Sequence, residues 1–318
     1  MKNTSRFTAL TLLLVLVLSV PAYGWSDTGH MAVAFVAYKR LNPQTRARVD
    51  ALVGLNPNFN TFSSKIPSGT SAANRRLMLF MLAATWPDFI KGDGVHHSDG
   101  PDGGNTPPSD GTAANNTGYP DTAMHKYWHF IDRPFSPDNT DLEDPPVPNA
   151  QTQIAAFRAV LASNSPDALK SYDLCWLLHL VGDVHQPLHA ATRFTQAQSG
   201  GDDGGNGVTV RDGSQTKRLH AFWDGILGTS KKPADAVAVG QALANAPTAA
   251  GNNLDVNDWL DESFNAAKAT VYKQPPIGVG NGPFTITAAY RSSAKALARK
   301  RVALAGARLA NILNNELR

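Results

Sequence analysis

The chain has 318 residues, of which 42% are hydrophobic, and its 29 Lys and Arg against 26 Asp and Glu give a formal net charge of +3. This balance argues against a protein that holds a nucleic-acid backbone with a broad basic surface, because such proteins carry a stronger excess of Lys and Arg. The one cysteine, Cys175, excludes an intrachain disulfide and lies in an apolar run, where a buried, inert thiol is expected.

The N-terminus has the layout of a secretory signal peptide. Two basic residues precede an apolar run over residues 9–20, and small residues at 22–24 mark a cleavage point. The run is shorter than the roughly 20 residues that a membrane-spanning helix needs. We therefore expect residues 1–24 to be removed, which leaves a secreted or periplasmic domain of residues 25–318 with Trp25 at its N-terminus. Loss of the two cationic residues lowers the formal net charge from +3 to +1.

Helical periodicity dominates the remaining chain, and no linker-like stretch divides it, so we expect one mostly α domain. Helices are predicted over residues 31–41, 43–55, 72–85, 153–162, 166–181, 216–226, 233–246, 256–271 and 285–314. The last should be amphipathic, with its leucines on the core and its Arg and Lys elsewhere. Residues 92–120 are predicted to form an unusually long loop, and residues 198–212 end in a short strand of a hairpin.

Histidines and aspartates recur at spacings that bring them together. His179 and Asp183 lie four residues apart in a predicted helix, and His220 and Asp224 repeat that spacing in another. A single pair of this kind is usually a hydrogen-bonded or salt-bridged couple. Further candidate ligands accompany the two pairs: the amine of Trp25, His30, Asp88, His129 and His189. Burying so many ionisable groups without metal is costly, and imidazoles with carboxylates and no thiolate suit zinc.

The order of these motifs identifies a resemblance to a known family. The motifs are Trp25 with His30, Trp86-Pro87-Asp88, His129-Phe130-x-Asp132, the block from His179 to His189, Asp203-Gly204-Gly205-Asn206, and His220-x2-Trp223-Asp224. Together they resemble the zinc-dependent single-strand nucleases of the S1/P1 type, which share a helical fold with bacterial zinc phospholipase C. The resemblance implies a single-domain, multi-helix fold with a small β-hairpin, and it covers most of residues 25–318.

The resemblance implies three zinc ions per chain. The ligands would be Asp88, His129, His179 and Asp183 for the first ion, Trp25, His30 and Asp183 for the second, and His189, His220 and Asp224 for the third. Two neighbouring divalent ions bring the pKa of bound water toward about 7, and a third can stabilise charge on a leaving oxygen. In this family the residue that matches Asp88 also orients the attacking water.

The same resemblance implies residues that contact the substrate. Lys91 would lie near the charge that develops at phosphorus, although a solvated lysine at a helix end is the alternative. Phe130 would stack a base, with Asp132, Gly204 and Asn206 at the edge of that base, although Phe130 could equally belong to the core. Stacking on an aromatic ring requires unpaired bases and tolerates any sequence.

We therefore predict an exported zinc phosphodiesterase, an endonuclease that hydrolyses single-stranded DNA and RNA to 5′-phosphorylated products, with 3′-nucleotidase activity as a further expectation. We expect a monomer without stable membrane association, whose partners are its substrates, single-stranded nucleic acid and nucleotides. Because it cannot form disulfides, the chain resembles bacterial members of the family more than eukaryotic ones.

Two alternatives stay open at this point. One is a zinc phospholipase C, a family that places Glu where this chain has Asp224. The other is a non-catalytic zinc-binding structural protein, against which Asp88 and Lys91 argue, because a purely structural site needs no residue to activate water.

Overall fold

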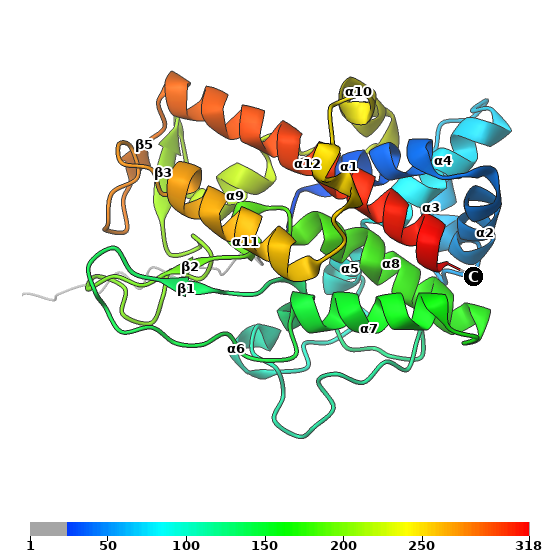
Figure 1. Cartoon of the computed structure of the whole chain (residues 1–318), viewed down its shortest axis with the longest axis horizontal. Helices are drawn as coiled ribbons and strands as arrows, with labels where there is room; N and C mark the ends of the chain where they lie inside the picture. The colour runs from blue at the N-terminus through cyan, green and yellow to red at the C-terminus, as the bar shows by residue number, and fades with distance from the viewer. Residues whose placement is uncertain (1–23, 318) are drawn as a thin grey trace, which may run out of the picture.

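The structure is a computed structural model that describes residues 24–317, so the predicted signal peptide, apart from Gly24, lies outside the described residues. It is built mainly from helices (Figure 1), which confirms the predicted mostly α class. The longer helices are α1 (Asp27–Arg40), α2 (Pro43–Val53), α4 (Ala72–Ala83), α7 (Ala150–Ala162), α8 (Asp167–Asp183), α10 (Pro233–Ala244), α11 (Val256–Ala266) and α12 (Ala288–Glu316).

Short helices and strands fill the connections. The helical ones are α3 (Phe59–Ser64), α5 (Trp86–Phe89), α6 (Pro101–Gly104), α9 (Leu219–Asp224), η1 (Ile90–Gly92), η2 (Lys126–His129), η3 (Pro187–His189), η4 (Ala249–Asn252) and the π-helix η5 (Ala267–Val271). The strands are β1 (Pro134–Phe135), β2 (Thr192–Arg193), β3 (Thr209–Asp212), β4 (Gln215–Arg218) and β5 (Phe284–Thr285). Strands β1 and β2 pair in parallel, while β3 lies between antiparallel β4 and parallel β5.

Helices α1 and α8 form the centre of the protein. Helix α1 packs against α4, α8, α10 and α12, and α8 also contacts α2, α5 and α7. The sequence of each helix is apolar on nearly every side, so residues 28–38 of α1 and 170–183 of α8 are buried throughout. Polar residues on these two helices therefore lie inside the protein, where they need partners.

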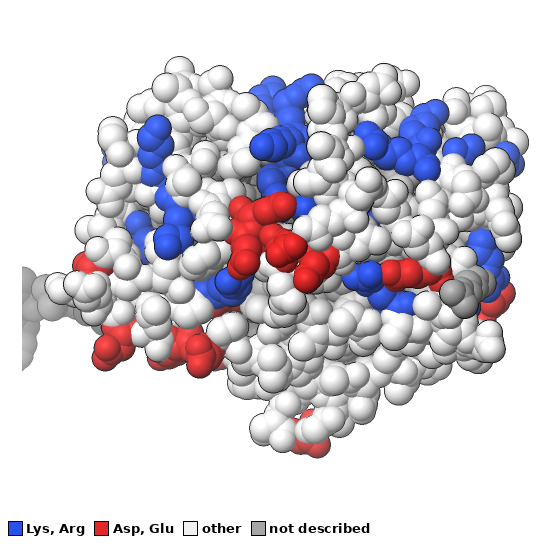
Figure 2. All heavy atoms as spheres, in the orientation of Figure 1, with Lys and Arg blue, Asp and Glu red and all other residues white. Residues whose placement is uncertain are grey.

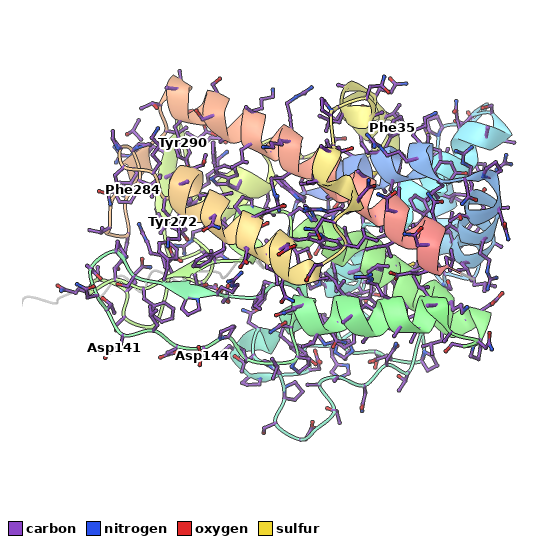
Figure 3. The ribbon with its side chains drawn as sticks, viewed as in Figure 1. Phe35, Asp141, Asp144, Tyr272, Phe284 and Tyr290 are labelled. Carbon is purple, nitrogen blue, oxygen red and sulfur yellow. The ribbon has the colours of Figure 1, made fainter. Side chains whose placement is uncertain are left out.

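Glycines on α10 and α12 let these two helices pack closely against α1. A Cβ at Gly240 of α10 would lie 2.5 Å from the Phe35 ring, and one at Gly306 of α12 would lie 2.6 Å from Val36. Figure 3 shows Phe35 beneath α10, and at the opposite end it shows Tyr272, Phe284 and Tyr290. Tyr272 and Tyr290 belong to a second apolar cluster that underlies η3, β3 and α9.

The prediction of a helix over residues 216–226 is wrong in its first part. Residues 215–218 pair with β3, and only residues 219–224 are helical. The reason is a two-residue turn between paired Asp212 and Gln215, in which Gly213 has a φ of +64°. Glycine adopts this conformation readily, and the resulting hairpin outweighs the helical propensity of the segment.

The amphipathic prediction placed the Arg and Lys residues of α12 away from the core. For two of the arginines this is wrong. Arg301 and Arg308 are buried, and their guanidinium groups donate to the Glu262 carboxylate of α11 at 2.6–2.8 Å. Arg308 also donates to His185 Nε2 at 2.9 Å, so this buried network ties α12 to the end of α8. Figure 2 shows the surface of this face, where acidic residues gather over α11 and Lys and Arg over α12.

The long segment over residues 92–120 packs along α8 and α5. Asn116 donates to both Asp173 carboxylate oxygens at 2.9 Å, and the Tyr119 ring meets the Trp86 ring edge to face. Within residues 24–317, no helix combines the length and apolarity needed to cross a bilayer.

Candidate metal centre

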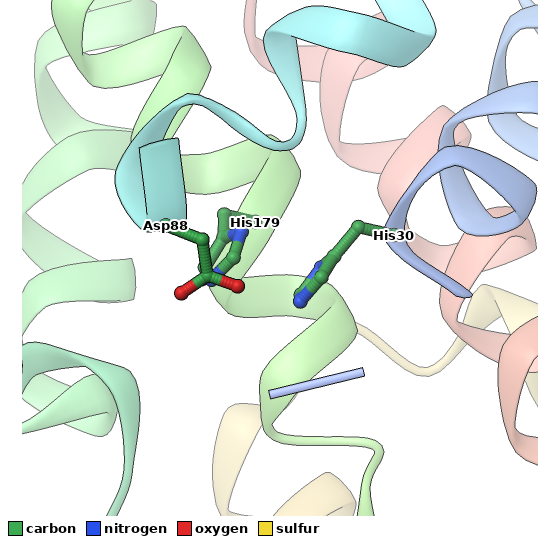
Figure 4. Close-up of side chains that lie close together, drawn as sticks. All are labelled: His30, Asp88 and His179. Atoms are coloured by element: carbon green, nitrogen blue, oxygen red, sulfur yellow. The ribbon is translucent and has the colours of Figure 1, made fainter. Parts of the chain in front are cut away.

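Three separate elements bring His30, Asp88 and His179 together. His30 comes from the first turn of α1, Asp88 from α5, and His179 from the last turns of α8 (Figure 4). The His30 and His179 rings stack at 3.7 Å with 15° between their planes. All three residues are buried, so two core helices and one short helix fix the positions of their side chains.

A first cluster contains His129 Nδ1, His179 Nε2 and Asp183 Oδ2, which lie 3.0–3.2 Å from one another. Asp88 Oδ1 completes it at 3.7 Å from His179 Nε2 and 3.9 Å from His129 Nδ1. His179 donates its Nδ1 proton to the carbonyl of Ala84 at 2.8 Å, which leaves a lone pair on Nε2. The edges of a zinc tetrahedron with bonds of roughly 2.0–2.1 Å are close to this spacing.

A second cluster brings two histidine lone pairs face to face. His189 donates its Nδ1 proton to His129 O at 2.8 Å, and His220 donates its Nδ1 proton to Gly204 O at 2.7 Å. The two Nε2 atoms then lie 3.2 Å apart, and Asp224 Oδ2 lies 3.5 Å from His220 Nε2. Three electron-rich atoms at this spacing repel one another unless a cation lies between them, so this cluster has the donor set and orientation of a metal site.

The third grouping lies at the start of the described chain. His30 Nε2 and Asp183 Oδ1 are buried 3.3 Å apart. A Cβ built on Gly24 would lie 1.7 Å from that Asp183 oxygen and 3.0 Å from His30 Nε2, so the backbone beside Trp25 borders both atoms. This backbone is fixed, because Ser26 donates its N–H to Asp224 O at 3.1 Å and its hydroxyl to Gly228 O at 2.5 Å.

Buried nitrogen and oxygen atoms in the first and third groupings lack hydrogen-bond partners among the described residues, as expected of atoms that bind a cation. Within the described part of the chain, both ring nitrogens of His30, Asp88 Oδ2, His129 Nε2 and Asp183 Oδ1 are buried without a hydrogen-bond partner. Burial, and next the charge of Lys91, lowers the pKa of His129 to about 3, so its imidazole is neutral at physiological pH. Carboxylate oxygens without a hydrogen-bond partner, beside a neutral imidazole such as that of His129, are ligands that zinc takes.

The comparisons with known proteins agree with this geometry. The sequence pattern of the family described as S1/P1 Nuclease matches residues 25–318. The chain belongs to the S1/P1 nuclease family. Among curated relatives, it is 29% identical to Endonuclease 4 of Arabidopsis thaliana over 48% of this chain and 54% of the relative. It is 25% identical to Nuclease S1 of Aspergillus oryzae over 66% of this chain and 56% of the relative. The matched part thus spans about half the length of these relatives.

Lys91 of this S1/P1-family chain is not a solvated lysine at a helix end. Its Nζ lies 2.8 Å from Asp88 Oδ1, and 2% of its side chain is exposed. Burial alone would raise the pKa of Asp88, but the charge of Lys91 is the largest influence in the other direction, and the pKa is lowered. Asp88 is therefore ionised and oriented between a cation and the first cluster.

The predicted base-contact residues border the second cluster. Phe130 follows His129 and is half-buried, and Thr192 joins Asp132 to Gly204 through hydrogen bonds to both. Gly204 has a φ of +54°, and its carbonyl accepts the His220 proton, so it also orients that histidine. Asn206 is half-buried, and its side chain donates to Asp203 O at 3.0 Å.

Three further polar residues near the site were not predicted as ligands or substrate contacts. Gln186 donates to Asp224 Oδ1 at 2.8 Å and so fixes that carboxylate. His185 does not face the cluster: its Nδ1 donates to Val181 O and its Nε2 accepts from Arg308. His125 lies between Asp99 and Asp121, at 2.9 Å from each. Gln186 lies inside the block from 179 to 189, and Asp121 lies one helical turn's spacing from His125, so spacing could have pointed to both; Arg308 and Asp99 are distant in sequence from their histidines.

Gly182 shapes the site by lacking a side chain. A Cβ there would lie 2.9 Å from His30 Nδ1, so Gly182→Ala should displace the His30 ring even though alanine favours the helix by roughly 0.5–1 kcal/mol. We expect this variant to bind one metal ion per chain on the order of 10–100-fold more weakly, as when a partner that orients a ligand is lost. Metal content across a chelator titration measures this, with Gly200→Ala, which meets no atom within 4 Å, as the control. Equal metal retention in both variants would contradict the assignment.

Proposed function

We propose that this chain is an exported zinc-dependent nuclease that hydrolyses single-stranded DNA and RNA to 5′-phosphorylated products and also removes phosphate from 3′-nucleotides. The observation that carries the proposal is the pair of opposed lone pairs on His189 and His220, beside the first cluster around Asp88. Three zinc ions, when bound by the three groupings, would supply Lewis acidity and an activated water.

We assign the other catalytic and binding roles to three side chains of this chain. Asp88, held by Lys91 at 2.8 Å, would orient the attacking water as a charged hydrogen-bond acceptor. Lys91 places a positive charge where negative charge develops on the non-bridging oxygens. Phe130 would hold a base by stacking, which only an unpaired strand permits.

The place of the proposed base-contact residues supports the proposed 5′-phosphorylated products. They border the cluster of His189, His220 and Asp224, because Gly204 O is bonded to His220. We propose that a nucleoside bound there has its 3′-oxygen beside this cluster, whose residues His189, His220 and Asp224 would hold an ion able to stabilise the charge of a leaving group. The phosphate then stays on the 5′-carbon of the next nucleotide, which gives 5′-phosphorylated products.

The start of the family match is consistent with the proposed export. The family match begins at residue 25, the residue that we propose as the mature N-terminus, and the free amine of Trp25 would join His30 and Asp183 as a metal ligand. We propose a monomer that is secreted or periplasmic in a bacterium, without stable membrane association.

The test compares single-stranded DNA, RNA and phosphatidylcholine as substrates of the processed, zinc-loaded protein. The proposal predicts hydrolysis of both nucleic acids and products that carry 5′-phosphates. Hydrolysis of the lipid alone would instead establish the phospholipase C alternative. Absence of turnover on all three substrates by fully metallated protein would establish the structural zinc-binding alternative.

A further inference from the structure

A groove lined by lysines continues from the metal centre along the surface. Its inner part, of about 320 Å³, is lined by Asp27, Asp88, Phe89, Lys65 and Lys231 among others. Its outer part, of about 640 Å³, is lined by Lys65 and Lys231 again, together with Lys232. The same two lysines, Lys65 and Lys231, border both parts, which are together called the lysine groove here. Each part has the volume of an ordinary ligand site.

The lysines come from distant parts of the sequence and are held by the fold. Lys65 follows α3, and its ammonium lies over the Phe62 and Phe89 rings at 5.6 and 5.5 Å from their centroids. Lys231 and Lys232 are exposed and directly precede α10. Helix α4 contacts both α3 and α10, so these lysines lie on one side of the same group of helices.

The charge of the lysine groove suits a chain of phosphates. No carboxylate is among the residues that line its outer part, and the nearby Asp235 accepts a hydrogen bond from the Ser230 hydroxyl at 2.6 Å. At the inner end, burial and next Asp88 raise the pKa of Asp27, whereas Lys231 and Lys65 lower it. Both lysines therefore act electrostatically on Asp27 at the inner end, and the charged residues that line the outer part are all lysines.

We propose that the lysine groove binds the backbone phosphates of a single strand beyond the nucleotide that carries the reacting phosphate. This rests on the proposed nuclease function. In the proposed function, the nucleoside on the other side of the scissile bond occupies the site of Phe130 and Asp132. We place the continuing strand past Asp88, because Asp88 lines the inner part of the groove. Contacts to phosphates are independent of base sequence, and they add affinity only for substrates longer than a dinucleotide.

The experiment measures KM for a 20-nucleotide single-stranded DNA and for a dinucleotide over a range of salt concentrations. The variant Lys231→Gln/Lys232→Gln is compared with Lys295→Gln/Lys300→Gln, which removes the same charge from exposed positions on α12. For the first variant we expect the KM of the long strand to rise about tenfold at low salt. The salt dependence of its apparent affinity should weaken by roughly 0.7 per lysine in log–log slope. The α12 variant should behave like the unmodified protein.

Two outcomes would overturn the lysine groove as a phosphate site. One is an equal effect of both double variants, which would indicate general charge only. The other is an equal rise in KM for the dinucleotide, which would place the lysines at the reacting phosphate. If the unmodified protein cleaves neither substrate, the nuclease proposal fails. Fluorescence anisotropy of the labelled, uncleaved strand then tests the groove separately, and the same loss of affinity and of salt dependence in the first variant alone would support it.

Discussion

Asp88→Asn is expected to lower kcat on single-stranded DNA by roughly 10³-fold, because several kcal/mol of transition-state stabilisation depend on an intact, charged water-orienting ligand. The Asp88 carboxylate touches Lys91 at 2.8 Å on one oxygen, and its other oxygen has no hydrogen-bond partner among the described residues. The amide keeps the shape but removes the charge that pairs with Lys91 and faces the first cluster. Steady-state kinetics on the zinc-loaded variant measures the effect.

Circular dichroism separates this loss from unfolding. Asp88 lies on the four-residue helix α5, outside the long helices, so the far-ultraviolet spectrum should stay helical. Asp167→Asn is the matched control, since Asp167 also pairs with a cation, Arg48 at 2.6 Å, but is more than half exposed at the start of α8. A near-normal kcat for Asp88→Asn would show that the role assigned to Asp88 is wrong.

A protein that retains Gly24 ahead of Trp25 is expected to bind one metal ion fewer per chain and to lose activity by at least about 10²-fold. Gly24 lies directly beside Asp183 Oδ1 and His30 Nε2, so a retained residue occupies the space between these ligands and converts the Trp25 amine into an amide. An amide nitrogen has no free lone pair for zinc, whereas a deprotonated amine does.

Two forms released from a fusion by a specific protease test this prediction, one starting at Trp25 and one at Gly24. A third form with one glycine added after Arg318 controls for the extra residue. Mass spectrometry verifies the termini, and metal analysis with nuclease assays gives the outcome. If the Gly24 form matched the Trp25 form in metal content and rate, the N-terminal amine would have no part in the site.

The sequence predicted most of the helices because their ends carry local signals. Pro43 and Pro233 each occupy the first position of a helix that was predicted to begin there, and Asn42 caps the first of these through a hydrogen bond to Thr45. The hairpin at 209–218 was only half recognised, because the turn at Gly213 was not weighed against the helical pattern that follows. Buried Arg301 and Arg308 were missed, because their partner Glu262 lies on another helix.

Part of the candidate site could also be predicted from local sequence signals. His179 and Asp183, and His220 and Asp224, are pairs one helical turn apart, and such pairs can be recognised from spacing alone. The features that depend on long-range packing could not be predicted. Spacing does not reveal that Gly182 faces His30, or that Lys65 and Lys231 share a groove.

Diffraction from crystals of the processed protein at the zinc absorption edge tests the central claim most directly. Three anomalous peaks per chain are expected: one among Asp88, His129, His179 and Asp183, one at Trp25, His30 and Asp183, and one among His189, His220 and Asp224. A single peak, or the absence of a peak between His189 Nε2 and His220 Nε2, would contradict it.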